Sequence, residues 1–251
     1  MSSRTARFAR VIGLASVALA CLTFVSPAAS ASGYNYRSYA PADGVWGGYV
    51  AQGSGFTTIS GSWIEPQVSC NSGNDVFAPW VGVDGYGSET VEQTGVETNC
   101  YNGSPAYQAW YEMYPAQPVY WNDPVDAGDH MTGSVVDNGG GNYTLTLTDD
   151  SKGWTETTQQ YLGAQDVSAE AVIESPSQSY PSFSSLQFEN VTVNGQAFDA
   201  YNPQAITSGG YGPGPISNGS FTITPGGFGA HATHAKHGAG THQGARPTVR
   251  Y

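Results

Sequence analysis

The stretch YQAWYEMYP, from Tyr107 to Pro115, indicates how this chain folds. Successive side chains of a strand point to opposite sides of a sheet, so Ala109, Tyr111 and Met113 would share one face. The other face would carry Gln108, Trp110, Glu112 and Tyr114. This second row makes a poor hydrophobic core and a good floor for a groove that grips an extended polar chain. The alternative is an exposed sheet face with cross-strand pairs.

Other segments show the same alternation of residue types with a period of two. In AEAVIE, Glu170 and Glu174 alternate with Ala171 and Ile173. Further alternating runs lie at 56–60, 143–148 and 186–193, and Asn-Gly turn dipeptides follow several strands. No segment has the pattern of an amphipathic helix. The sequence therefore predicts an all-β fold, a single antiparallel β-sandwich.

The two ends of the chain differ from its middle. Arginines at 4, 7 and 10 precede the apolar run 11–25, and Ala29-Ser30-Ala31 resembles a signal-peptidase site. We expect a signal peptide at 1–31 cleaved near Ala31, a short segment at 32–44, the folded domain at 45–225 and a flexible tail at 226–251. The expected protein is secreted and extracellular, without stable membrane association, because no later run has the length of a membrane span.

Acidic residues dominate the middle of the chain. All 20 Asp and Glu follow the signal segment, whereas residues 32–225 hold only Arg37 and Lys152, which gives 2 − 20 = −18. Such a surface is a poor partner for nucleic acid and repels itself less at acid pH. With so few basic residues, salt bridges are not expected to hold the fold together.

Two cysteines, Cys70 and Cys100, remain after the signal segment. In an oxidising compartment an isolated pair predicts a disulfide, which would close a loop of about 30 residues. Gln93 lies inside this loop, so the bridge would hold an expected Gln93-Thr94-Gly95 turn in place.

The sequence lacks the residues that several common catalytic mechanisms require. The expected domain has one histidine, His130, and no free thiol, which disfavours Ser-His-Asp and Cys-His mechanisms. It has no metal-ligand spacing and no Asp-Thr-Gly motif. The tail holds four clustered histidines, which would bind metal only loosely. We therefore expect no cofactor and no metal, and a chemistry of carboxylates and amides.

Five segments in a fixed order carry a resemblance. The chain resembles the glutamic peptidases (eqolisins, pepstatin-insensitive acid proteases) at VWGG (45–48), WVGVDG (80–85), QTG (93–95), AWYEMYP (109–115) and AEAVIE (169–174). The resemblance implies a lectin-like sandwich of two large curved sheets, with the cleft on a concave sheet face. It assigns catalysis to Gln93 and Glu174.

The resemblance also implies a substrate and a cleft. The expected partners are polypeptides, bound by a monomer and hydrolysed in acid by a water that ionised Glu174 activates, with Gln93 stabilising the oxyanion. We take the pKa of Glu174 to be near the reference value of about 4. Ala171 replaces the usual aromatic of the family, and Gln108 an aspartate. The residues expected to bind substrate are Trp46, Trp80, Asp84, Glu97, Gln108, Trp110, Glu112, Tyr114 and Glu170.

Two other kinds of function stay open at this point. Paired carboxylates and tryptophans also suit a carbohydrate-active enzyme on a lectin-like sandwich. However, Glu170 and Glu174 lie about 13 Å apart along a strand, whereas glycosidases need about 5–9.5 Å between carboxyls. The second alternative is a non-catalytic module that binds a peptide or glycan.

Overall fold

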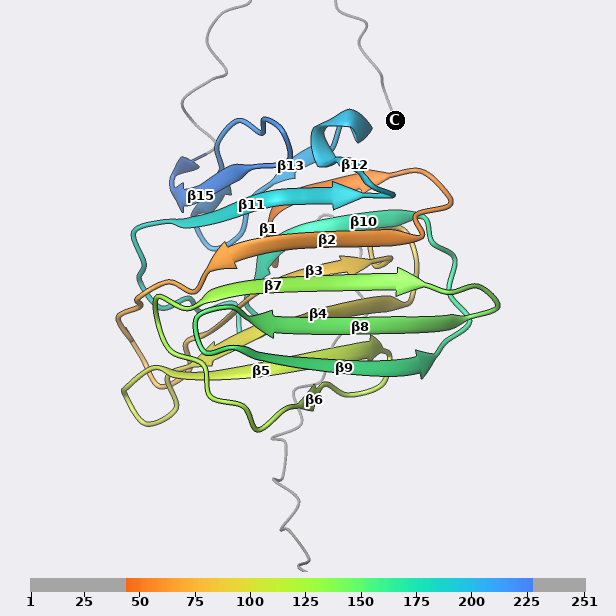
Figure 1. The fold of residues 1–251 in the computed structure, drawn as a ribbon. Helices are drawn as coiled ribbons and strands as arrows, with labels where there is room; N and C mark the ends of the chain where they lie inside the picture. Colours follow the sequence, from red (N-terminus) through yellow and green to blue (C-terminus); the bar gives the residue numbers. More distant parts are fainter. Residues whose placement is uncertain (1–43, 228–251) are drawn as a thin grey trace, which may run out of the picture. The chain divides into compact units, whose positions relative to one another are not determined.

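Two antiparallel β-sheets stack face to face around one hydrophobic core (Figure 1). This computed structural model describes residues 44–227. The predicted signal peptide, almost all of the segment 32–44 and nearly all of the tail 226–251 lie outside the described residues. Within them no helix is long and apolar enough to cross a membrane.

The first sheet has seven strands and carries the segments that the sequence singled out. Its order across the sheet is β13 (Gln204–Ile206), β1 (Trp46–Gln52), β10 (Ser168–Glu174), β3 (Val76–Val83), β4 (Val91–Asn99), β5 (Ala106–Tyr114) and β6 (Val119–Tyr120).

The second sheet has eight strands and covers one face of the first. Seven of them lie in the order β14 (Tyr211–Pro213), β15 (Phe221–Pro225), β11 (Leu186–Val193), β2 (Thr58–Ile64), β7 (His130–Asp137), β8 (Asn142–Asp149) and β9 (Trp154–Tyr161). The short β12 (Gln196–Ala197) pairs with β11, and a 3-10 turn at Phe198–Tyr201 is the only helix of the described chain.

The core lies between the inner faces of the two sheets, as the alternation of residue types predicts. From the first sheet Ala109 and Ile173 are buried in it, and from the second sheet Trp63 and Phe188. Ala171, which replaces the aromatic common in the family, also faces this core. The all-β sandwich and the alternation of the two key strands are therefore confirmed.

The predicted disulfide is confirmed, but the predicted turn beside it is wrong. Cys70 and Cys100 are bonded, at a sequence separation of 30. The segment Gln93–Gly95 is not a turn, because it lies in the middle of β4. A Cβ on Gly95 would stand 2.2 Å from the carbonyl oxygen of Pro79 and 2.7 Å from Cβ of Trp80. The glycine is thus needed for close packing against β3, not for chain reversal.

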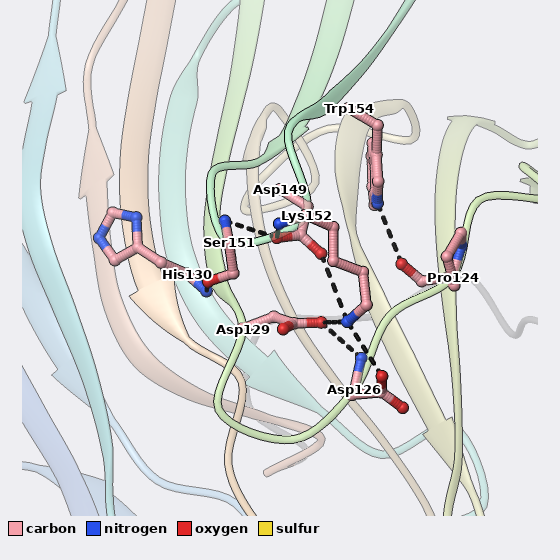
Figure 2. Close-up of polar contacts among 8 residues, drawn as sticks. All are labelled: Pro124, Asp126, Asp129, His130, Asp149, Ser151, Lys152 and Trp154. Atoms are coloured by element: carbon pink, nitrogen blue, oxygen red, sulfur yellow. Dashed lines mark hydrogen bonds and ion pairs between the residues drawn. The ribbon is translucent and has the colours of Figure 1, made fainter.

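The one lysine of residues 44–227, which hold no arginine, forms an ion-pair cluster (Figure 2). The Lys152 ammonium lies 3.0 Å from a carboxylate oxygen of Asp126 and 3.9 Å from one of Asp149, and it hydrogen-bonds Asp129. The Asp149 side chain is fully buried and that of Asp129 is 12% exposed. Because residues 44–227 hold one lysine and no arginine, ion pairing by Lys or Arg is confined to this corner of the sandwich.

Candidate active site

The outer face of the seven-stranded sheet, on the side away from the core, carries a second apolar cluster. Its buried members include Trp46, Trp80 and Trp110 from β1, β3 and β5, and Tyr114 and Tyr120 pack against them. Trp46 meets Trp80 edge to face, with ring centroids 4.9 Å apart. Aromatic residues therefore line the face on which the sequence predicted a groove.

The strand register places both predicted catalytic residues on this face. Gly82 of β3 lies opposite Glu170 of β10 on one side and Gln93 of β4 on the other. Glu174 lies four residues further along β10 than Glu170, opposite Ala78 of β3. Gln93 and Glu174 thus project from strands that flank β3, on one side of one sheet.

Glu174 is a buried carboxyl of which one oxygen accepts a hydrogen bond and the other has no hydrogen-bond partner among the described residues. The Trp80 indole N–H donates to its Oε2 at 3.1 Å, while Oε1 has no hydrogen-bond partner among the described residues. Burial raises the pKa of Glu174 to about 7, although its polar interactions with Trp80 and Trp46 act in the opposite direction. The expectation of an ordinary pKa near 4 is therefore wrong, because the strand places this carboxyl under a layer of tryptophans.

Gln93 is held by its neighbour on β5. Its Nε2 donates to Oε2 of Glu112 at 2.5 Å, and its Oε1 has no hydrogen-bond partner among the described residues. Both side chains are at most 2% exposed. The pKa of Glu112 is raised to about 8, because burial and then the charge of Glu174 raise it more than the hydrogen bond from Gln93 lowers it. Glu112 therefore orients the Gln93 amide and is protonated in acid.

The remaining residues of the predicted groove lie on the same face, toward one end. Glu97 of β4 lies opposite Gln108 of β5, and its Oε2 accepts a hydrogen bond from Tyr120 at 2.9 Å. Burial raises the pKa of Glu97. Sequence reasoning missed Tyr120, because a strand of two residues leaves no periodic pattern to find.

Two predicted site residues have different surroundings from the others. Glu170 shares the face of Gln93 but is completely buried, and neither of its oxygens has a hydrogen-bond partner among the described residues. Asp84 follows β3, and its carboxylate accepts three backbone N–H groups from residues 165–167. These contacts favour a structural role for Asp84 over contact with a substrate.

Comparison with known proteins places this geometry in a family. The profile of the peptidase A4 family matches residues 44–207, which include every strand of the outer face described above. The chain belongs to the peptidase A4 family. Two curated relatives are similar to it: aspergillopepsin-2 of Aspergillus niger, 32% identical over 111 residues, and scytalidopepsin B of Scytalidium lignicola, 32% identical over 110 residues.

These alignments cover 36% and 43% of this chain. The chain in turn spans 39% and 37% of the length of the two relatives, so the sequence match is partial.

Solved structures of A4-type peptidases share the fold of this chain. Scytalido-glutamic peptidase with a transition-state analogue inhibitor superposes with a TM-score of 0.63 at 22% identity, over 73% of this chain and 98% of that one. Aspergilloglutamic peptidase from Aspergillus niger superposes with a TM-score of 0.50 at 24% identity, over 60% and 99%. At this identity the likeness establishes the sandwich, and the chemistry depends on the residues described above.

Proposed function

We propose that this chain is a secreted acid endopeptidase that hydrolyses peptide bonds with Gln93 and Glu174 and forms no covalent intermediate. The observation that carries the proposal is a pair of open polar atoms, Oε1 of Glu174 and Oε1 of Gln93, on one tryptophan-lined sheet face. Buried polar atoms without partners are costly. A water molecule or a substrate that satisfies both would remove that cost. Membership of the peptidase A4 family supports a peptide as the substrate.

The raised pKa of Glu174 determines how the reaction begins in acid. A carboxyl with a pKa of about 7 is protonated there. Its Oε2 accepts the Trp80 N–H, so the proton resides on Oε1, the oxygen that is open. Glu174 therefore enters the reaction as a general acid rather than as the ionised base that the sequence suggested.

The proposed reaction then uses one proton relay. Glu174 donates its proton to the carbonyl oxygen of the scissile bond while a water molecule held by Oε1 of Gln93 attacks the carbonyl carbon. The second N–H of the Gln93 amide, which Glu112 does not take, donates a hydrogen bond to that oxygen and polarises the carbonyl for attack. The Glu174 carboxylate next accepts a proton from the attacking water and passes it to the leaving amine. As the C–N bond breaks, Glu174 takes back the proton on the former carbonyl oxygen, which leaves a carboxylic acid product and restores the protonated glutamic acid.

The test is hydrolysis of a denatured protein between pH 2 and 7 in the presence of pepstatin. Glu174→Gln should lose about 10²–10⁴ of the rate, because it can no longer transfer a proton. Gln93→Ala should lose about 10²–10³. Matched controls are Glu89→Gln and Gln187→Ala, which make the same chemical changes at exposed positions and should keep full activity. Undiminished proteolysis in either site variant would overturn the assignment.

The two alternative functions predict other outcomes in the same assay. Cleavage of a polysaccharide without cleavage of any protein would identify a carbohydrate-active enzyme. Peptide binding at every pH without turnover would identify a binding module. No contact in the described structure favours either alternative, and the hydrogen bond of Gln93 to Glu112 orients an amide, which a glycosidase mechanism does not need.

A further inference from the structure

Three carboxyl groups from separate parts of the chain meet at one end of the sandwich. Asp84 follows β3, Glu92 lies in β4, and Asp166 precedes β10. One oxygen from each lies within 4.8 Å of the others. Glu92 is adjacent to Gln93 in its strand and so points to the opposite side of the sheet from the candidate active site. The cluster is thus separate from the residues to which peptidase activity is assigned.

The three carboxyls differ in how they are satisfied. Asp84 accepts backbone N–H groups from residues 165–167, and Asp166 accepts the Tyr143 hydroxyl at 2.7 Å. Glu92 is completely buried, yet neither of its oxygens has a hydrogen-bond partner among the described residues. A buried carboxyl aimed at two other carboxyls needs a positive partner or a proton.

The protein itself supplies such a partner to another acidic cluster, but not to this one. Figure 2 shows Lys152 among Asp126, Asp129 and Asp149, where its ammonium compensates three aspartates. Lys152 is the only Lys or Arg within residues 44–227. His130, the one histidine of these residues, pairs with Asp150. No basic side chain of the described domain therefore remains to compensate Glu92 and its two neighbours.

A shared proton fits the arrangement less well than a metal ion. A protonated Glu92 would donate a short hydrogen bond to one of the aspartates, but its oxygens make no such bond. Oxygens up to 4.8 Å apart instead leave room for a central ion. Ca²⁺ binds oxygen ligands at about 2.3–2.6 Å in flexible geometry, so it tolerates an irregular set of three carboxylates, whereas Mg²⁺ demands near-ideal octahedral geometry.

We propose that Asp84, Glu92 and Asp166 form a calcium-binding site. Asp166 is half-buried, so it gives the ion a route from solvent and leaves space for water ligands. The bound ion would tie the connection after β3 to the segment before β10. Strand β10 bears Glu174, and β3 lies between β10 and β4, which bears Gln93. The site would therefore stabilise the fold around the candidate active site near neutral pH without taking part in hydrolysis.

The test is calcium binding to the full chain, measured by titration calorimetry at pH 7 and by luminescence of Tb³⁺ excited through nearby aromatic residues. We expect one site with a Kd of about 10⁻⁴–10⁻³ M, the range of extracellular calcium modules. CaCl₂ at 10 mM should raise the Tm by roughly 3–8 °C relative to EDTA. At pH 3 the calcium effect should be much smaller, because protons compete with the ion for carboxylate ligands.

Two variants and one control locate the ion. Glu92→Gln and Asp166→Asn should abolish the calcium-dependent rise in Tm, whereas Glu89→Gln, at an exposed position three residues from Glu92, should keep it. Asp166→Asn keeps an oxygen for the Tyr143 hydroxyl and serves if Glu92→Gln does not fold. The absence of any calcium effect in the wild type would overturn the proposal. An equal effect in wild type and both variants would overturn it too, because the ion would then bind elsewhere.

Discussion

Gln93 and Glu112 face each other directly across β4 and β5, and Nε2 of the glutamine donates to Oε2 of the glutamate at 2.5 Å. This contact determines which way the Gln93 amide points. Oε1 of Gln93 has no hydrogen-bond partner among the described residues, and one amide N–H is not used by Glu112. Glu112 is thus a positioning residue in the proposed mechanism, and it does not itself transfer protons.

The first prediction concerns this pair. Glu112→Ala should lower kcat by about 10–100-fold, because the amide loses the partner that orients it, an effect of about 1.4–2.8 kcal/mol. Glu112→Gln should keep most of the activity, because a neutral amide oxygen replaces the acceptor of a carboxyl that is already protonated below about pH 8. Steady-state kinetics at pH 4 check both values. Equal activity in the alanine variant and the wild type would refute the positioning role.

The second prediction concerns the Trp80 N–H, which donates to Oε2 of Glu174. This bond favours the ionised carboxylate, so Trp80→Phe should raise the pKa of Glu174 further. A hydrogen bond to a charged group contributes about 1.5–3 kcal/mol, which corresponds to a shift of about one pH unit or more. The pH above which activity falls should move upward by that amount. A profile that moves to lower pH would contradict the assigned contact.

The third prediction uses Glu65, a fully buried carboxyl that accepts hydrogen bonds from Trp63 and Thr98. Burial raises its pKa to about 8 from a model-compound value of 4.5. A raised folded-state pKa means that the folded state binds the proton more tightly than the unfolded state does. The stability that Glu65 contributes is therefore complete below about pH 4.5 and is lost as the pH rises through about 8.

Chemical denaturation at several pH values measures this loss. Between these two pKa values the free energy of unfolding should fall by about 1.4 kcal/mol per pH unit from this group alone. Glu65→Gln should remove that slope and leave the rest of the pH dependence unchanged. The same slope in the variant would show that Glu65 is not the responsible group.

The fourth prediction concerns Lys152 and the three aspartates around it. Lys152→Met should destabilise the protein at pH 7 by about 2–3 kcal/mol, between the small effect of an exposed pair and the larger one of a buried pair. Burial acts to raise the pKa of Asp129, but the contact with Lys152 and hydrogen bonds with Asp126 and Asp149 together lower it. The loss should shrink at pH 2–3, because burial raises the pKa of Asp149 and this partner loses its charge in acid. An equal loss at both pH values would indicate lost packing rather than lost charge.

Much of the architecture was predictable from the sequence, because it depends on local patterns. Period-two alternation placed Ala109 and Ile173 in the core and Trp110 and Glu174 on the opposite face. Two cysteines in a chain with an expected signal peptide predicted the disulfide. Each of these inferences needs only one strand or one pair of residues.

The parts that the sequence did not reveal depend on contacts between distant segments. The sequence predicted Gly95 in a turn. Its actual role depends on close contact with Pro79 and Trp80, which exists only when β3 and β4 pair. The raised pKa of Glu174 follows from its burial in the folded sheet, and the two tryptophans that act against it, Trp80 and Trp46, belong to two other strands. The cluster of Asp84, Glu92 and Asp166 joins three segments that have no regular spacing.

The most direct test of the proposed mechanism is the pH dependence of kcat/KM from pH 2 to 8 on a peptide substrate with no ionisable side chains. If protonated Glu174 begins the reaction, kcat/KM should be high in acid and fall tenfold per pH unit above a pKa of about 7. A rate that rises with pH through 7 would contradict this account, because the ionised carboxylate would then be the active form.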